Sequence, residues 1–213
     1  MSALQTLKYE TKRKNLYLRV AVGHFATTNR HTNYYIDVVS QKARLSEARA
    51  VAEELASYYY ADTVVDTILC LDGTEVIGAC LADCLSKADI LNMNAHKSIY
   101  VVTPEITNSN QILFRDNIIP MIKDKNVMIL AVSVSSGKTA LAAIDAIRYY
   151  GGKVSGISSI FSTEKDCIGF PVYSVFNPND LDGYAVYRPH ECPMCKEGMK
   201  LDALINSHGF SKL

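Results

Sequence analysis

The sequence predicts an α/β fold: a doubly wound, mainly parallel sheet with helices on both faces and a small N-terminal hood. Strand-like apolar runs alternate with segments of helical periodicity over most of the 213 residues, which is typical of a sheet built from strand–helix units. The strands are almost continuously apolar, as in Asn126–Val134, and such strands are usually covered on both faces. Apolar residues make up 48% of the chain and charged residues 21%, as expected for a globular protein with its own core.

The individual core elements follow from apolar spacing and from turn residues. Apolar residues recur at helical spacing over Leu45–Tyr59, and the β-branched run Val64–Cys70 stops at the turn signal Asp72-Gly73. Gly151-Gly152 closes the last predicted helix, because glycine readily adopts the left-handed conformation of a C-terminal cap. In chain order, the other expected elements are helix Thr74–Lys87, strand Ser98–Thr103, strand Asn126–Val134, helix Lys138–Tyr150, and strands Lys153–Phe161 and Val172–Phe176.

We expect one domain with three successive parts, a hood, an α/β core and an irregular tail: residues 1–40, 41–180 and 181–213. In the hood, the strand-like segments Leu16–Val22 and Tyr34–Val39 flank a polar stretch. The tail contains a Cys-x-x-Cys motif and a short helix expected near Met199–Ser207.

Charge and composition exclude several function classes. Twenty-two basic residues balance twenty-two acidic ones, so the chain has no net charge to draw it to nucleic acid or to an anionic membrane. No apolar stretch has the length of a signal peptide or a membrane span. Cys70, Cys80 and Cys84 lie in apolar runs, which suits reduced core thiols. We therefore expect a cytoplasmic protein.

The most informative segment is a loop between the apolar strand Asn126–Val134 and the following helix. Backbone N–H groups at such a turn favour an anion, and small hydroxyl residues, a glycine and a lysine add donors, close approach and charge. The simpler alternative is that Ser135 and Thr139 only cap the helix. A triphosphatase P-loop is disfavoured, because its first glycine would fall at Val132. The predicted phosphate-binding residues are Ser135, Ser136, Gly137, Lys138 and Thr139.

Three motifs together resemble a known family. In the first motif, the apolar strand Val127–Leu130 is followed by Ala131 and Val132, two spacer residues and the loop Ser135–Thr139. In the second motif, Asp66–Ile68 precedes the turn Asp72-Gly73-Thr74. In the hood, Gly23-His24-Phe25 precedes Asn29-Arg30 and a Tyr-rich strand. In this order, over most of the chain, the motifs resemble the type I phosphoribosyltransferases, and among them the orotate phosphoribosyltransferases.

The resemblance implies a ligand, a cofactor and an assembly. The ligand is 5-phosphoribosyl diphosphate (PRPP) or a nucleotide, Mg²⁺ accompanies the diphosphate in an active enzyme, and relatives commonly form homodimers. Asp72 and Glu75 are the carboxylates expected to hold metal-bound water. Tyr34 and Tyr35 are candidates for stacking on the base. The pyrophosphate loop corresponds to Leu71, Asp72, Gly73 and Thr74.

The chain departs from the family where the chemistry takes place. The family's acidic pair, which holds the ribose hydroxyls, is replaced by Ala131 and Val132, a loss of roughly 3–6 kcal/mol of charge-assisted hydrogen bonding. The segment that matches the family's lysine-rich mobile loop, Thr103–Asn110, has no cation, the hood lysine falls near Thr28, and the family's orotate-contacting arginine is replaced around Ser162-Thr163. Two functions remain open: phosphoribosyl transfer to a base, and non-catalytic binding of a nucleotide or ribose 5-phosphate.

The tail motif Cys192-Pro193-Met194-Cys195 has the spacing of half a zinc site. We expect two thiols in a tight turn, because a structural site needs four ligands and the chain has no second Cys-x-x-Cys. His190, His208 or a partner subunit could supply the missing ligands. The histidines His24, His31 and His96 are taken as scattered.

Overall fold

The computed structural model describes residues 6–10, 16–87, 92–95, 97–107, 109, 111–206 and 209–213. The chain divides into two compact units. The first unit comprises Met1–Ser40 and Pro178–Leu213, and the second unit comprises Gln41–Asn177. Among the helices of the described residues, none has the length and apolar character needed to span a membrane.

The second unit is built on a six-stranded sheet. Its strands are β4 (Thr67–Cys70), β5 (Tyr100–Val102), β8 (Asn126–Val134), β9 (Lys153–Ser162), β10 (Asp166–Cys167) and β11 (Phe170–Phe176). They lie in the order β10-β11-β9-β8-β4-β5. All neighbouring pairs from β11 to β5 are parallel, and the edge strand β10 is antiparallel. The predicted α/β fold with a mainly parallel sheet is confirmed.

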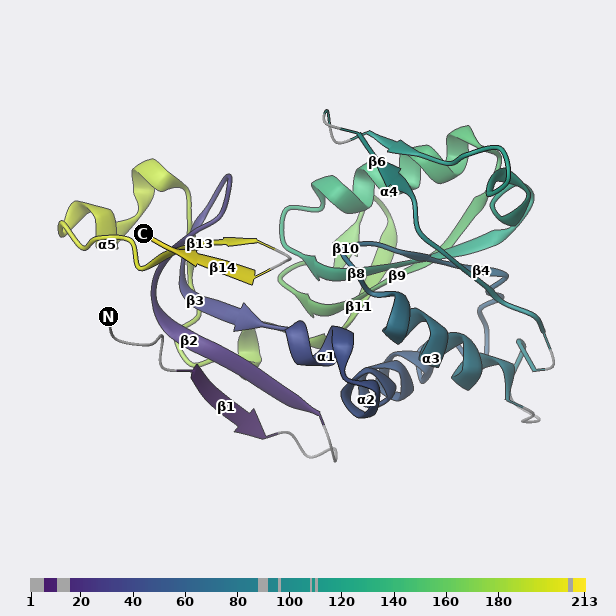
Figure 1. Cartoon of the computed structure of the whole chain (residues 1–213), viewed down its shortest axis with the longest axis horizontal. Coiled ribbons are helices and arrows are strands. Elements are labelled where there is room, and N and C mark those ends of the chain that lie inside the picture. The colour runs from purple at the N-terminus through teal and green to yellow at the C-terminus, as the bar shows by residue number, and fades with distance from the viewer. Residues whose placement is uncertain are drawn as a thin grey trace. The chain divides into compact units, whose positions relative to one another are not determined.

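Helices cover both faces of this sheet (Figure 1). The three long ones are α2 (Leu45–Ala56), α3 (Glu75–Ser86) and α4 (Lys138–Tyr149), close to the predicted bounds. The apolar stripe of α4 shares a core cluster with Leu69 and Ile129. On the other face, α3 approaches so closely that a Cβ on Gly78 would collide with Cys70 Sγ. Leu69 and Cys70 point to opposite faces because side chains alternate along a strand.

Burial in this core keeps its thiols inert. Cys70, Cys80 and Cys84 are buried and free, as predicted for reduced core thiols. Burial raises the pKa of Cys70 to about 12. Since the thiolate is the reactive form, these cysteines have a packing role.

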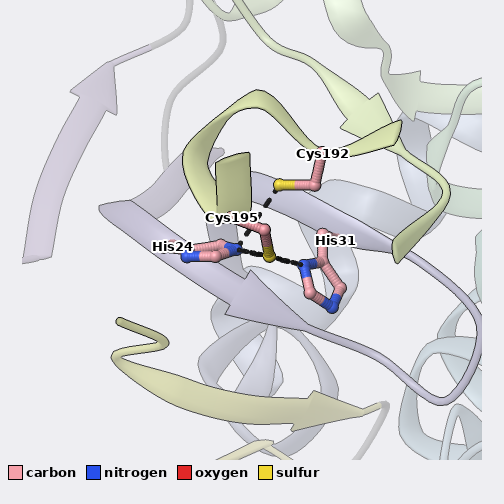
Figure 2. A group of neighbouring side chains, drawn as sticks. All are labelled: His24, His31, Cys192 and Cys195. Carbon is pink, nitrogen blue, oxygen red and sulfur yellow. Dashed lines mark hydrogen bonds between the residues drawn. The ribbon is translucent and has the colours of Figure 1, made fainter. Parts of the chain in front are cut away.

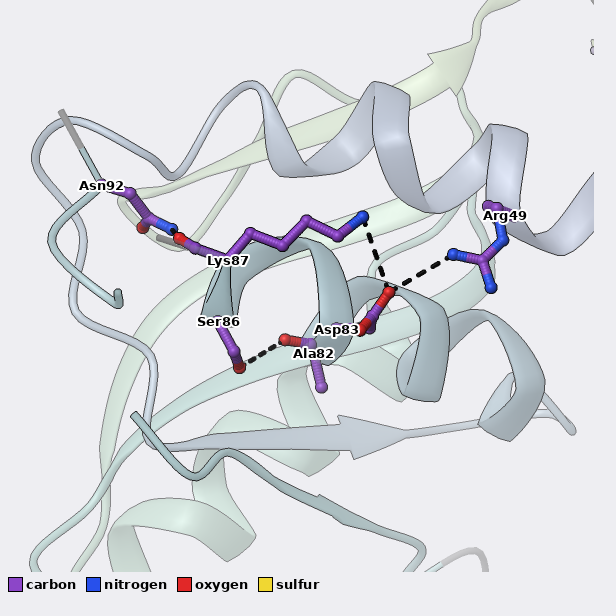
Figure 3. Close-up of polar contacts among 6 residues, drawn as sticks. All are labelled: Arg49, Ala82, Asp83, Ser86, Lys87 and Asn92. Carbon is purple, nitrogen blue, oxygen red and sulfur yellow. Dashed lines mark hydrogen bonds and ion pairs between the residues drawn. The ribbon is translucent and has the colours of Figure 1, made fainter. Parts of the chain in front are cut away.

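Polar contacts fix the end of α3 (Figure 3). The amide nitrogen of Asn92 donates to the carbonyls of Leu85 and Lys87, at 2.5 and 2.9 Å, which satisfies acceptors at the helix end. Asp83 forms ion pairs with Arg49 of α2 and with Lys87. All three charged side chains are substantially exposed, so these pairs contribute little to stability.

A second sheet forms the first unit. Its strands are β1 (Thr6–Glu10), β2 (Tyr17–Ala26), β3 (His31–Asp37), β12 (Val186–Tyr187), β13 (Ala203–Asn206) and β14 (Gly209–Lys212). The order is β12-β3-β2-β13-β14, and β1 also pairs with β2. The hood strands and the C-terminal tail therefore share one sheet.

The tail contains a strand where the sequence predicted a helix. The helix expected near Met199–Ser207 is wrong, because Ala203–Asn206 is a strand that pairs in parallel with β2. Ala203 is fully buried while Leu204 is exposed, the alternation of a strand with one covered face. A short apolar run fits either element, and here the pairing with β2 decides.

Several short elements connect the larger ones. In the first unit these are η2 (Pro178–Asp180), η3 (Pro189–Glu191) and α5 (Pro193–Lys196). Elsewhere they are α1 (Val39–Ala43), β6 (Glu105–Ile106), β7 (Ile112–Leu113) and η1 (Ile119–Met121).

Candidate functional site

The strand order places two loops at the same edge of the sheet, after neighbouring strands. The chain passes from β4 outward to β5 and then returns to the other side of β4 to form β8, so the winding direction reverses between β4 and β8. In open α/β sheets, ligands bind beyond the carboxyl ends of the strands at such a switch point. The loops that leave these two strands are Leu71–Thr74 and Ser135–Thr139, the two predicted from sequence. The backbone N–H of Leu71 donates to the carbonyl of Leu130 at 2.8 Å, which ties the end of β4 to the middle of β8.

The loop after β8 has the geometry of an anion-binding turn. Gly137 occupies the N-cap position of α4 in the left-handed conformation, with φ of 68°. No side chain caps this helix, so the alternative that Ser135 and Thr139 serve as caps is wrong. The first helical bond runs from the N–H of Leu141 to the carbonyl of Gly137 at 2.7 Å. The side chains of Ser135, Ser136, Lys138 and Thr139 are exposed and accessible to a ligand.

Residues at the end of β9 form hydrogen bonds with the start of this loop. Thr163 donates its N–H to the carbonyl of Val134 at 3.0 Å and its hydroxyl to the carbonyl of Ser135 at 3.2 Å. The hydroxyl of Ser162 also donates to Val134. Ser162 and Thr163, which stand where the resembled family has an arginine, therefore position the loop after β8.

The loop after β4 is a tight turn with two left-handed residues in succession. Asp72 has φ of 56° and Gly73 has φ of 79°. The hydroxyl of Thr74 lies 2.9 Å from the carbonyl oxygen of Leu71 and 3.1 Å from that of Leu130. Because Leu130 belongs to β8, this contact fixes the turn to the neighbouring strand.

Lys42 adds a cation to this turn, although no motif in the sequence points to it. Its Nζ donates to the carbonyl of Asp72 at 2.8 Å and lies 3.6 Å from where a Cβ on Gly73 would sit. The lysine precedes the turn by thirty residues and comes from the short helix α1, so only the folded chain brings it there. The turn Leu71–Thr74 thus has the ammonium group of Lys42 beside it.

The two positions that match the acidic pair of the resembled family are apolar and buried in the structure. Ala131 and Val132 are 2% and 4% exposed within β8. The segment that matches the mobile loop of the resembled family forms part of the short β6–β7 hairpin. There, Glu105 accepts from the guanidinium Nε of Arg115 at 2.6 Å, so the one acid of that segment has a cationic partner.

The two hood tyrosines pack inside the first unit. The hydroxyl of Tyr34 donates to the carbonyl of Asp182 at 2.8 Å. The ring of Tyr35 meets Phe210 edge to face, with 5.2 Å between centroids, and burial raises the pKa of Tyr35 to about 12. Tyr34 and Tyr35 are 7% and 5% exposed, so the structure does not present them as a stacking platform for a base.

The tail cysteines lie beside two histidines of the hood. The side chains of His24, His31, Cys192 and Cys195 meet in one cluster (Figure 2). Taking His24 and His31 as scattered was therefore wrong. His190, offered as a completing ligand, instead pairs with Glu191 at 3.4 Å. His96 and His208 lie outside the described residues.

Known proteins resemble this chain at low identity. No family model matches the sequence. Orotate phosphoribosyltransferase of Chlorobaculum parvum is 23% identical over 184 residues, which cover 85% of this chain and 86% of the relative.

Solved structures share the fold. The UMP synthase of Leishmania donovani matches with a TM-score of 0.54 and 20% identity. The match covers 75% of this chain and 34% of that protein, so this chain corresponds to about a third of the synthase. Orotate phosphoribosyltransferase of Mycobacterium tuberculosis matches with a TM-score of 0.50 and 17% identity, over 78% of this chain and 93% of that one.

Proposed function

From the type I phosphoribosyltransferase fold that this chain has, we propose that it acts as an orotate-phosphoribosyltransferase-like enzyme of nucleotide metabolism. It would bind PRPP and transfer the phosphoribosyl group to a nitrogenous base. The observation that carries the proposal is that the turns Leu71–Thr74 and Ser135–Thr139 follow the two strands that flank the switch point of the sheet, where ligands of such folds bind.

In this proposal each loop binds one end of the substrate. The exposed hydroxyls and backbone N–H groups of Ser135–Thr139 bind the 5-phosphate. The turn Leu71–Thr74, together with Lys42, binds the diphosphate. In the transfer, the bond between ribose C1 and the diphosphate oxygen breaks and the diphosphate leaves with the electron pair. A bond from C1 to a base nitrogen forms, and that nitrogen loses its proton to solvent.

Residues at the pyrophosphate turn suit Mg²⁺. The turn carries Asp72, and Glu75 follows it with an exposed side chain whose carboxylate oxygen lies 3.9 Å from where a Cβ on Gly73 would sit. Mg²⁺ is commonly bound through one or two carboxylates together with substrate phosphates. When bound, it would neutralise charge on the departing diphosphate.

One observation favours a second function, binding without transfer. Ala131 and Val132 are buried and offer no side-chain oxygen where the resembled family holds the ribose hydroxyls. Without those contacts, recognition would depend on the phosphate groups. Such a protein would bind a nucleotide or ribose 5-phosphate as a sensor.

Calorimetry and an activity assay separate the two functions. Titration with PRPP, ribose 5-phosphate and nucleotides, with and without Mg²⁺, tests binding. Release of diphosphate from PRPP in the presence of orotate or another base tests transfer. Turnover supports the enzyme, and binding without turnover supports the sensor. If no phosphate compound binds at millimolar concentration, both functions are excluded.

Replacement of Lys42 by alanine tests the diphosphate assignment. We expect Lys42→Ala to weaken PRPP binding about tenfold, which corresponds to about 1.4 kcal/mol for one lost charge-assisted contact. Binding of inorganic phosphate at the other loop should change little. The matched control is Lys87→Ala, because Lys87 pairs with Asp83 at the far end of α3. Equal losses in both variants would argue against a role for Lys42.

A further inference from the structure

The cluster of His24, His31, Cys192 and Cys195 lies in the first unit, apart in sequence from the phosphate loops. One ligand atom from each side chain lies within 4.8 Å of the others. The histidines come from the β2–β3 hairpin and the cysteines from the start of α5 (Figure 2). Four side chains from segments about 170 residues apart therefore point to one place.

We propose that this cluster binds a structural Zn²⁺ ion in a Cys₂His₂ site. With Zn–S near 2.3 Å and Zn–N near 2.05 Å, a tetrahedral site places nitrogen and sulfur about 3.6 Å apart and the two nitrogens about 3.3 Å apart. The Nε2 atom of His24 lies 3.5 Å from Cys192 Sγ, 3.6 Å from Cys195 Sγ and 3.0 Å from His31 Nδ1. Cys195 Sγ lies 3.3 Å from His31 Nδ1. The separations match one tetrahedral ion.

The surroundings of His24 select the nitrogen that faces the ion. Its Nδ1 lies 3.0 Å from the carbonyl oxygen of Met199. A carbonyl only accepts, so Nδ1 carries the hydrogen and the neutral ring presents the lone pair of Nε2 to the cluster. A hydrogen bond of this kind on the far nitrogen is the usual support of a metal-bound histidine.

A β-bulge in the backbone at His24 orients its ring toward the cluster. A β-bulge between Val22 and Phe25 places two residues of β2 opposite one of β3, and bulges re-aim side chains. Asp202 holds the bulge on both sides: its carboxylate accepts the N–H of His24 at 2.8 Å, and its own N–H donates to the carbonyl of His24 at 2.8 Å. A Cβ on Gly23 would lie 2.5 Å from the same carboxylate, so any other residue would displace Asp202 from this position.

The cysteine segment closes as a compact turn. The N–H of Lys196 donates to the carbonyl of Cys192 at 3.2 Å, and that of Gly198 to Cys195 at 3.0 Å. Gly198 has φ of 75° and reverses the chain, which places Met199 against His24. The turn thus supplies two ligands and the acceptor that orients a third.

The ligand set indicates a structural role. Four protein ligands close the coordination shell of zinc, whereas a catalytic site keeps a position for water. Zinc would join the hairpin of the hood to the tail and stabilise the unit.

Metal analysis with paired histidine variants tests the site. Protein purified without chelators should contain one zinc per chain. His31→Ala should lose most of this zinc, and His190→Ala should keep it, because His190 is an exposed neighbour of the same turn that pairs with Glu191. Equal zinc content in the two variants would overturn the proposal.

The wild-type chain provides a test that does not depend on a variant folding. After chelation, the protein should bind one Co²⁺ with the absorption of a tetrahedral site that has thiolate ligands, and Zn²⁺ should displace it. Its melting temperature should fall on chelation and recover with Zn²⁺ but not with Mg²⁺. Absence of zinc together with no Co²⁺ uptake, or a Cys192–Cys195 disulfide in the freshly purified protein, would overturn the proposal. Phosphate binding is measured separately, so either proposal can fail alone.

Discussion

The Gly137→Val variant is expected to lose phosphate binding, with affinity reduced at least about 100-fold, or about 2.7 kcal/mol. Gly137 has φ of 68°, a conformation in which a β-branched residue is a genuine outlier. A Cβ would also lie 3.3 Å from Cys167 Sγ, so the loop or this thiol must give by a few tenths of an ångström. The strained backbone would turn away the N–H groups that we propose bind the phosphate. Calorimetric titration with PRPP and with inorganic phosphate measures the loss.

A second glycine provides the matched control for this variant. Gly183 has the same φ of 68°, and nothing lies within 4 Å of the position of its missing Cβ. Gly183→Val therefore introduces the same backbone strain in the other unit, without an effect on the loop. We expect it to keep phosphate affinity. If Gly137→Val binds phosphate as well as Gly183→Val does, the loop is not the phosphate site.

The Ala131→Glu variant restores one acid of the resembled family. We expect it to lower the free energy of unfolding by about 3–5 kcal/mol. Ala131 is 2% exposed and belongs to the core cluster that packs under α4. A carboxylate there would lose its hydration without a partner in that cluster. Urea unfolding measures the change. The control is Ser133→Glu, because Ser133 is exposed two residues later on the same strand.

The same variant should show a defined pH dependence. Burial raises the pKa of the introduced carboxyl in the folded state above its unfolded value of about 4.3. The folded state then binds more protons than the unfolded state between these two pKa values, so stability falls as pH rises through this window. We expect the free energy of unfolding of the variant to lie further below that of the wild type at pH 8 than at pH 5. A difference that does not change with pH would mean that the carboxyl reaches solvent.

The sequence by itself determined the fold class and the location of the two turns that we propose as anion-binding loops. Strand and helix periods are local properties, and β8 and α4 have the predicted bounds within one residue. The glycine and hydroxyl composition of Ser135–Thr139 likewise reports a local turn geometry. The missing acids at Ala131 and Val132 are evident from the sequence, since a residue type needs no structure to be recognised.

Tertiary structure alone decided which distant residues meet. Lys42 donates a hydrogen bond to Asp72, thirty residues later in the chain. His24 lies beside Cys192, which is 168 residues away in the sequence. The Cys-x-x-Cys spacing could indicate only half of a metal site, because the other ligands are positioned by pairing of β2 with β3 and by the bulge at His24. The tail strand Ala203–Asn206 was likewise mistaken for a helix, because a short apolar run acquires its conformation from the strand that it pairs with.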